Sequence, residues 1–509
     1  MPRELGVRRI VWITLLLVLF AGVLCSYRVD EAIHEDSALW FAYTQKFWAA
    51  FARGKLNRTY QLPHPGVTMM WLAGIVLKLS GTIEGAMDPR GVWAVKAIGV
   101  LIGTLSPALT FPLAIACLGK TQWRPALVLS ALLATEPLLV QQARIGELDM
   151  AALGLTWLSL WMAILAYERN SWRWALGAGV LAGAAALTKL TFAVMPTVLM
   201  TILIGQSVST RFRDRRGLRV AALAALAALV TVFALWPALW TNARATVLHL
   251  WQESAHQGRR GNYHLVEGHW VSDPGARYYL SFVVEAIMVE TAILAAVGAA
   301  VLYFVPAVRK HYAWLIVSLV PYLLILTMIP KKHSRYWVPV APIFCLLASA
   351  GIEWLWPRVS RAFKQARLAQ LVPVALVALL LGGRYARELW LLPAAEACSS
   401  WPGVVCKRPW NSFFARELGL AMRKDWEAGG HRGRPRVYLS DADQRLMSPW
   451  LNVKATQNLR KADYVVVWDS VFDDHQLSSN AARHLGRRAT EVHVVHYAGD
   501  VVARVFRGR

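Results

Sequence analysis

Apolar runs recur along the chain from Ile10 to about Leu381, and they constrain the fold more than any other feature of the sequence. Hydrophobic residues make up 56% of the 509 residues and charged residues only 17%, which is too apolar for a water-soluble chain of this length. Lipid must be the main solvent of this region, so we predict an all-α polytopic membrane domain over residues 1–383. The polar, mixed sequence of residues 384–509 predicts a separate C-terminal domain.

Three arginines precede the first apolar run, residues 10–24, as they would in a secretory signal. However, no small-x-small cleavage pattern precedes Cys25, and Leu24 does not fit a lipoprotein-type site. Because further apolar runs follow, we interpret the segment as an uncleaved anchor of a bacterial cytoplasmic membrane protein, with its N-terminus in the cytoplasm.

The formal net charge of +24 is compatible with nucleic-acid binding, but the basic residues are dispersed in short turns between apolar runs. This distribution is typical of topology determinants. We therefore expect membrane lipids, and no nucleic acid, as the surroundings of these turns.

Positive charge also decides how often the chain crosses the bilayer. The candidate segments are residues 10–26, 67–79, 92–118, 126–141, 150–166, 174–187, 190–205, 218–240, 278–305, 312–329, 337–356 and 368–381. If all of them crossed, five strongly basic turns would face outward, against the positive-inside rule. Segment 67–79 is short of the roughly 20 residues that a spanning helix needs. We therefore predict about eleven crossings and an outer interfacial helix over 67–79.

With this topology, charged segments gather on the outer side. They are a large first outer loop over residues 27–93, then 143–149, 188–189, 241–277, 330–336 and everything after about residue 382. Acidic and basic groups at helix mouths are expected where a charged headgroup meets the membrane surface.

The first outer loop carries the densest acidic run, with Asp30, Glu31, His34, Glu35 and Asp36. Such a run fits a solvated loop, a general base whose proton affinity is raised beside the low-dielectric interface, or a site for a divalent cation. The spacing does not distinguish these readings. No cofactor is certain from the sequence, and a divalent cation stays open.

Three further outer segments carry cations, and the first of them also carries carboxylates. Arg144 and Asp149 lie in the second outer loop, where Asp149 also suits a simple N-terminal helix charge. Lys189 lies in the third, and residues 330–336 carry Lys331, Lys332, Arg335 and Tyr336. Outward cations break the positive-inside pattern, and binding a phosphate explains them, although screening of anionic lipid headgroups would also do so.

At these residues the sequence resembles the bacterial glycosyltransferases of the C-type membrane fold, family 39, and is similar to the protein O-mannosyltransferases and the aminoarabinose transferase of lipid A. The matching blocks are residues 34–40, 59–71, 136–139, 143–144, 148–149, 187–189, 236–240, 272–275 and 330–339. Their order along residues 27–356 makes the match specific, although each block is weak alone.

The resemblance implies inverting transfer of one sugar, a hexose or a pentose, from a polyprenyl-phosphate carrier to a glycan, lipid or protein acceptor at the outer membrane face. It implies Asp36 as the base, with Glu35 as the alternative, because the usual Asp-Glu pair aligns with Asp36-Ser37. Asp149 matches a second acidic position. His64, Arg144, Lys189, Lys331, Lys332, Arg335 and Tyr336 are the candidate substrate-binding residues. The family often has Asp where Ser334 stands.

The C-terminal region shows β-like runs at 436–440, 464–468, 492–497 and 501–506 and a helix-like stretch at 412–428, which predicts a small extracytoplasmic α/β domain. This domain either binds the acceptor or forms a structural cap over the site. A disulfide between Cys398 and Cys406 is left open.

The rival function is a transporter or flippase for a lipid-linked sugar, but transporters place ionisable groups near mid-membrane, often in two related halves.

Overall fold

The computed structural model describes much of the chain, with gaps. The described residues are 5–27, 29, 35–61, 65–81, 83, 89–259, 264–266, 269–271, 275, 278–279, 287, 289–330, 334–362, 415–430, 436–438, 454–456, 463–468, 490–497 and 500–507. The predicted span 368–381 and the predicted boundary near residue 383 lie outside them, as do Cys398 and Cys406, whose disulfide the sequence left open.

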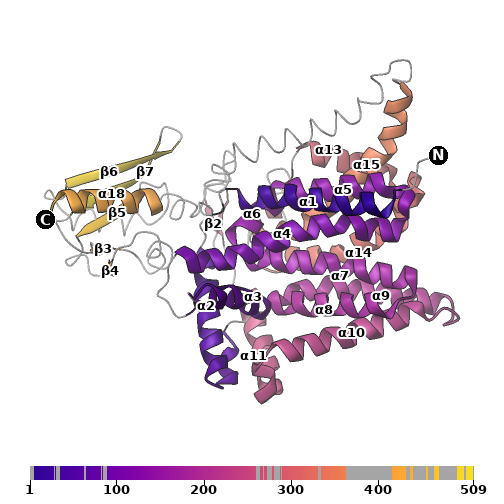
Figure 1. Cartoon of the computed structure of the whole chain (residues 1–509), viewed down its shortest axis with the longest axis horizontal. Coiled ribbons are helices and arrows are strands. Elements are labelled where there is room, and N and C mark those ends of the chain that lie inside the picture. The colour runs from indigo at the N-terminus through magenta and orange to yellow at the C-terminus, as the bar shows by residue number, and fades with distance from the viewer. Residues whose placement is uncertain are drawn as a thin grey trace.

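Long helices run side by side in one bundle (Figure 1). They are α1 (Val7–Ser26), α4 (Pro89–Leu118), α5 (Trp123–Thr135), α6 (Pro137–Ile145), α7 (Leu148–Arg169), α8 (Trp172–Thr188), α9 (Val194–Ser209), α10 (Arg216–Leu235), α13 (Val289–Val301), α14 (Pro306–Met328) and α15 (Ala341–Ala362). Short 3-10 helices adjoin them: η1 (Leu56–Thr59), η2 (Lys120–Gln122), η3 (Leu190–Ala193), η4 (Leu302–Phe304) and η5 (Ser334–Val340). The predicted helical membrane fold is confirmed.

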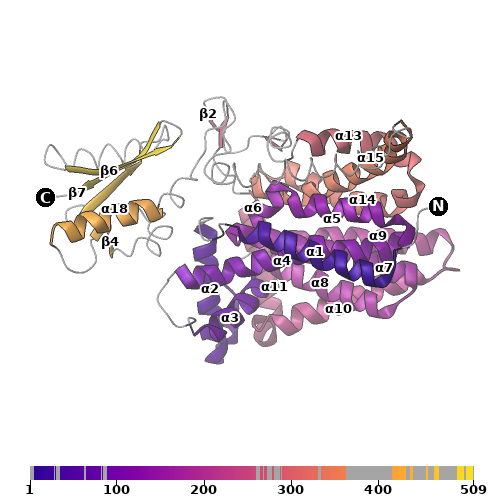
Figure 2. The ribbon, with the colours of Figure 1, turned by 45° about the horizontal axis from the view of Figure 1, so that its top comes forward.

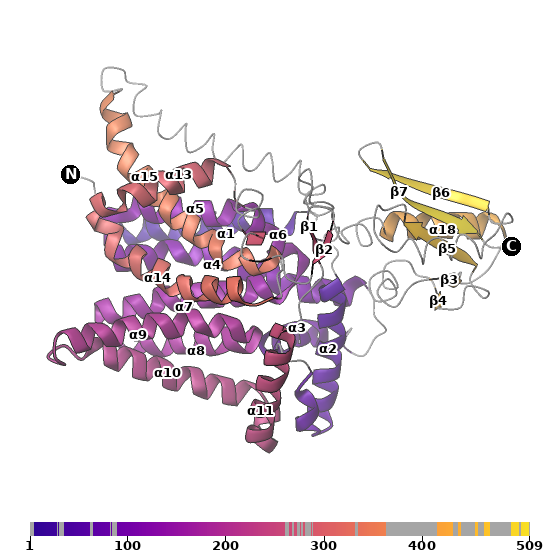
Figure 3. The same cartoon turned by 180° about the vertical axis from the view of Figure 1, so that it is seen from behind.

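Two helices lie across one end of this bundle instead of along it. They are α2 (Glu35–Ala52) and α11 (Ala238–Arg259), which is kinked at Asn242 (Figure 3). Between α2 and α4 the chain forms α3 (Val67–Leu79), with the bounds that the sequence predicted. Lys96 near the start of α4 donates a hydrogen bond to the carbonyl oxygen of Val29 just after α1. Because α1 ends where α4 begins, α2 and α3 together return the chain to the same end.

The number of crossings stays a prediction. In the described part of the chain, seven helices are long and apolar enough to cross a membrane, or eight if the bent pair α5 and α6, with 51° between them, forms one span. Helices α8 and α13, with 17 and 13 residues, correspond to two more predicted segments but are shorter than that criterion.

Helix α7 is the centre of the bundle. Of its most apolar stretch, 89% is buried against other helices, whereas for α1 the share is 22%. Trp157 and Trp161 on α7 pack edge to face with ring centroids 6.1 Å apart. The side chains of α1 that point away from the bundle, such as Leu15 and Leu19, are more than half exposed, as expected of a helix that faces lipid.

Glycines bring pairs of helices into backbone contact. A Cβ on Gly179 of α8 would lie 2.2 Å from the carbonyl oxygen of Ala224 on α10, and one on Gly298 of α13 would lie 1.7 Å from that of Leu347 on α15. Small residues at such crossings let helices pack by close van der Waals contact where lipid supplies no hydrophobic driving force.

The basic turns gather at the end of the bundle that holds the N-terminus (Figure 1). The Lys310 ammonium donates to Glu168 Oε1 (2.8 Å), and the Arg169 guanidinium donates to the carbonyl oxygen of Ala116 (3.2 Å). Arg124 lies over the ring of Trp356, 5.5 Å from its centroid. Turns that the positive-inside rule groups on one side are therefore neighbours in the structure.

Beyond the opposite end of the bundle lie α18 (Ala415–Ala428) and a five-stranded sheet of order β4-β3-β5-β7-β6 (Figure 2). Its strands are β3 (Arg436–Tyr438), β4 (Lys454–Thr456), β5 (Tyr464–Trp468), β6 (Thr490–Tyr497) and β7 (Asp500–Arg507). Strand β3 runs parallel to β4 and β5, while β7 is antiparallel to β5 and β6. A separate short hairpin pairs β1 (His264–Val266) with β2 (His269–Val271).

A small polar contact attaches α18 to this sheet. The Tyr464 hydroxyl donates to Asp425 Oδ2 (2.6 Å), and the Arg507 guanidinium donates to the same carboxylate (3.1 Å). Burial, together with its hydrogen bond to Asp425, raises the pKa of Tyr464, so it remains the donor. Strand β4 was not predicted from the sequence, because its three residues carry no alternating apolar pattern.

We expect Gly298→Ala to lower the stability of the detergent-purified protein by about 1–3 kcal/mol, because the new methyl group meets a backbone carbonyl that cannot rotate away. Gly205→Ala on α9 is the matched control, since a Cβ there has nothing within 4 Å. Thermal unfolding of both variants tests this. An unchanged midpoint for Gly298→Ala would contradict the close approach of α13 and α15.

Candidate active site at the mouth of the bundle

Five separate segments meet at the end of the bundle where α2 lies, which we call the mouth. They are the end of α1, the start of α2, the turn between α6 and α7, the break between α8 and η3, and η5. The Gly66 amide just before α3 donates to the carbonyl oxygen of Thr188 (3.3 Å), so the first outer loop is attached here too. The mouth therefore brings together parts of four of the six segments that the sequence placed on the outer side: 27–93, 143–149, 188–189 and 330–336.

The turn between α6 and α7 carries most of the charge. Helix α6 ends at Ile145, and Gly146 adopts a left-handed conformation (φ 69°) that lets the chain reverse within two residues. A Cβ at Gly146 would lie 3.0 Å from the backbone of Lys96, so the turn packs directly on α4. Glu147 and Asp149 follow, and both are 2% exposed.

An inner ion pair joins Asp149 to Lys189. The Lys189 ammonium donates to Asp149 Oδ1 at 2.6 Å, with side-chain exposures of 6% and 3%. Lys189 follows the last residue of α8 in an extended conformation (φ −152°, ψ 112°) that interrupts the helix before η3. Its ammonium also lies 4.5 Å from the ring centroid of Tyr336, a cation–π contact from η5.

An outer ion pair lies beside the inner one. Arg335 of η5 donates from Nη1 to Glu147 Oε1 at 2.9 Å, and its side chain is 23% exposed while that of Glu147 is 2% exposed. Arg335 is thus the more accessible of the two cations. Two buried or half-buried cations and two buried carboxylates make this four-residue cluster electrically neutral.

Further hydrogen bonds fix the turn that holds these carboxylates. The Arg144 guanidinium is buried and donates from Nε (3.1 Å) and Nη2 (2.6 Å) to the carbonyl oxygen of Leu24 at the end of α1. The Ser37 hydroxyl of α2 donates to the carbonyl oxygen of Ile145. The side chains of the cluster are held in place by neighbouring elements, which is what a preorganised charged site requires.

The structure brings together five of the residues singled out in the sequence: Arg144, Asp149, Lys189, Arg335 and Tyr336. The backbone of Glu35 and Asp36 forms the first turn of α2, next to Ser37, which contacts the α6–α7 turn. The side chains of Glu35 and Asp36, and all of His64, Lys331 and Lys332, lie outside the described residues.

Three buried charged residues were not predicted as site residues: two at the mouth and one at the bend between α5 and α6. Glu147 lies in the second outer loop, and its position two residues before Asp149 is the signal that could have identified it. Lys96, 1% exposed, interrupts an otherwise apolar span, which is itself a signal of a specific role. Glu136, fully buried, precedes Pro137 at the bend between α5 and α6.

No group of three or more His, Cys, Asp or Glu side chains suited to a metal ion occurs within the described residues. The acidic run that suggested a divalent cation has its side chains outside that part of the chain. A cation therefore remains a sequence-based prediction.

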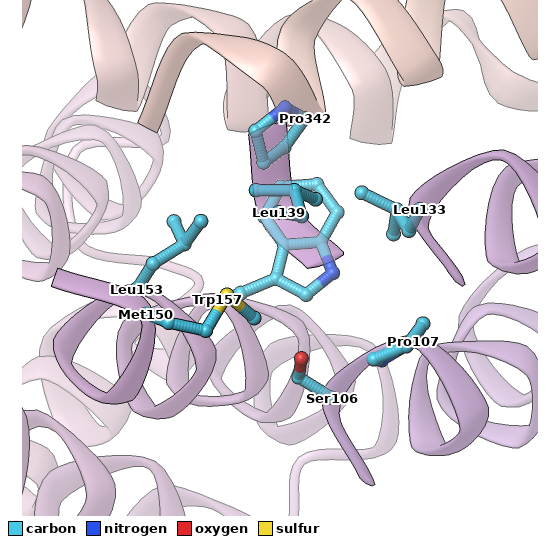
Figure 4. A pocket seen from close by; sticks show the side chains of 8 residues that line it. All are labelled: Ser106, Pro107, Leu133, Leu139, Met150, Leu153, Trp157 and Pro342. Atoms are coloured by element: carbon cyan, nitrogen blue, oxygen red, sulfur yellow. The ribbon is translucent and has the colours of Figure 1, made fainter. Parts of the chain in front are cut away.

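An apolar cavity lies one turn below Asp149 in the bundle (Figure 4). Met150 and Trp157 of α7, Ser106 of α4 and Pro342 of α15 are among its lining residues, and none of the lining side chains is ionisable. The Trp157 indole donates to the Thr110 hydroxyl (2.9 Å). This cavity belongs to the packed core and does not suit a phosphate, so the charged mouth is the candidate site.

Comparison with known proteins finds a matching family model and similar folds. Residues 64–236 match the model of a family described as dolichyl-phosphate-mannose-protein mannosyltransferase. That segment runs from just before α3 to the end of α10 and includes Arg144, Asp149 and Lys189. The predicted family resemblance is confirmed.

Among the solved structures with a fold similar to that of this chain are an ArnT and an oligosaccharyltransferase. ArnT from Cupriavidus metallidurans bound to undecaprenyl phosphate has a TM-score of 0.52 at 16% identity, covering 98% of this chain and 97% of that one. The oligosaccharyltransferase AglB from Archaeoglobus fulgidus, in complex with an inhibitory peptide and a dolichol-phosphate, has a TM-score of 0.51 at 11% identity, covering 98% and 74%. A search of curated proteins finds no significant match.

The inner ion pair predicts a specific pattern of stability. Lys189→Met leaves a buried carboxylate without its cation and is expected to cost about 3–5 kcal/mol. Adding Asp149→Leu to that variant should recover most of the loss, because a buried ion pair replaced by apolar side chains is often tolerated. Thermal unfolding in detergent measures both.

Asp214→Asn is the matched control, because it removes a carboxylate from an exposed pair with Arg216 at the other end of the bundle. We expect little change there. Equal losses in Lys189→Met and in the double variant would show that the pair does not act as a unit.

Proposed function

We propose that this protein transfers a monosaccharide from a polyprenyl-phosphate carrier to an acceptor hydroxyl, with inversion, at the outer face of a bacterial cytoplasmic membrane. The observation that carries the proposal is the charged cluster at the mouth, where Arg335 and Lys189 come from distant segments to one place. ArnT was solved with undecaprenyl phosphate and AglB with dolichol-phosphate and a peptide, which supports a lipid-phosphate donor for a chain of this fold.

In the proposed reaction Asp36 takes the proton of the acceptor hydroxyl while the oxygen attacks the anomeric carbon. The bond between that carbon and the phosphate oxygen breaks, and the lipid phosphate leaves with the bonding electron pair. Arg335, with Lys331 and Lys332, stabilises the charge that grows on the leaving phosphate. Such a donor brings its own leaving group, so the reaction needs no nucleotide.

The structure suggests a more specific role for Asp149 than the sequence did. Its carboxylate is buried and bonded to Lys189, so we assign it the role of a counter-ion that holds Lys189 and the α8–η3 break in place. Arg144 has a similar supporting role through the end of α1. The base that takes the proton of the acceptor hydroxyl is then Asp36, or Glu35 one residue earlier.

The positions of the ion pairs favour an enzyme over a flippase. In the described part of the chain, the ion pairs between bundle helices lie at the two ends: Glu147–Arg335 and Asp149–Lys189 at the mouth, Glu168–Lys310 at the other. A transporter is expected to keep ionisable groups near mid-membrane. The clustering of basic turns at the end away from the mouth supports a mouth that faces outward and an N-terminus in the cytoplasm.

Asp36→Asn tests the proposal. It keeps the size of the side chain but removes the base, so transfer from radiolabelled undecaprenyl-phosphate-linked hexose or pentose to membrane acceptors should fall by about 10²–10⁴-fold. Glu35→Gln decides which carboxylate is the base, since only one of the two variants should lose activity to this extent.

Asp214→Asn serves again as the control, because it removes a carboxylate at the opposite end of the bundle. Each variant is checked for an unchanged thermal midpoint before its activity is compared. Full activity in both Asp36→Asn and Glu35→Gln would contradict the assigned mechanism.

A further inference from the structure

The Glu147–Arg335 pair poses a problem for any anion that binds at the mouth. Arg335 is the accessible cation of the cluster, yet its Nη1 already contacts a buried carboxylate at 2.9 Å. A phosphate that approaches Arg335 must therefore share it with Glu147 or displace it. The sequence analysis did not predict that Glu147 contacts Arg335, because Glu147 was not among the candidate site residues.

The two ion pairs differ in how easily they can be exchanged. Lys189 and Asp149 have side-chain exposures of 6% and 3%, and the ring of Tyr336 covers the Lys189 ammonium. Arg335 has 23% of its side chain exposed, so solvent or a ligand reaches it from the open side while Glu147 holds it from the buried side. The Asp149–Lys189 pair is therefore shielded from ligands, whereas Arg335 can exchange Glu147 for another anion.

We propose that Glu147 is a built-in competitor of the carrier phosphate: it holds Arg335 when the site is empty, shares it while donor is bound, and helps to expel the lipid phosphate after transfer. This inference rests on the proposed function. Glu147 touches no reacting atom, so it acts as a positioning residue through Arg335.

Charge explains why the competition favours turnover. The donor is a phosphodiester with a single negative charge, while the product is a phosphate monoester that approaches two negative charges near pH 7. A fixed carboxylate within hydrogen-bond reach of Arg335 repels the product more than the donor. The neutral cluster therefore limits product inhibition, which matters where product release sets the turnover rate.

The experiment measures binding of undecaprenyl phosphate to the purified full-length protein in detergent. Glu147→Gln removes the competing charge at constant size, so the dissociation constant is expected to fall by roughly tenfold, as for one regained charge-assisted hydrogen bond. Under multiple turnover kcat should fall relative to the single-turnover rate of the same variant, because release of the lipid phosphate becomes slower.

The matched variants are Arg335→Gln and the double variant Glu147→Gln/Arg335→Gln. Arg335→Gln should weaken binding, and the second substitution should then have little further effect on affinity, because the proposed competition takes place at Arg335. Glu147→Asp keeps the charge but withdraws it by one methylene, so intermediate affinity is expected. Glu147→Asp also tests the inference if Glu147→Gln fails to fold.

A purely structural Glu147 would give a different pattern. Affinity would then stay the same or weaken in both Glu147→Gln and Glu147→Asp, and this outcome would overturn the inference while leaving the proposed function intact. If the wild-type protein binds no undecaprenyl phosphate, the proposed function fails, and the inference fails with it.

Discussion

The buried ion pair between Lys189 and Asp149 determines how the mouth of the bundle is organised. Each charge would cost several kcal/mol to bury alone, so the start of α7 and the break after α8 depend on one another. Glu147 extends this dependence to η5 through Arg335, and Arg144 extends it to the end of α1. One short turn thus links segments that are far apart in the sequence.

Much of the fold could be predicted, because the constraint that governs it acts locally. Helix α3 has the predicted bounds, since Gly66 before it and Ser80 after it limit a short apolar run. Helix α8 also corresponds to a predicted segment, extended by a few residues at its start. The positive-inside rule grouped the basic turns on one side, because the preference of Lys and Arg for the cytoplasmic side applies to every short loop.

The site was predicted only in part, because pairing depends on tertiary packing. The predicted topology put Lys189 and Arg335 on the same side as Asp149, but nothing in the sequence states that Lys189 pairs with Asp149, or that Arg335 pairs with Glu147 and not with Asp149. Lys96 looked like an ordinary member of an apolar span, yet its ammonium reaches the backbone at Val29. Such contacts arise from the approach of α4 to the α6–α7 turn, which depends on Gly99 and Gly146 as much as on the charges.

Helix α7 has ionic attachments at both of its ends, with Asp149 at the mouth and Glu168 at the opposite end beside Lys310. Its 22 residues give a length of roughly 33 Å, close to the hydrocarbon thickness of a bilayer. A helix that is buried among its neighbours and attached at both ends is expected to tilt only together with the bundle. A difference between the hydrophobic length of the bundle and the bilayer thickness would then be accommodated by the lipid-facing helices. The spacing between the two ends of the bundle would stay constant while the bilayer thickness varies.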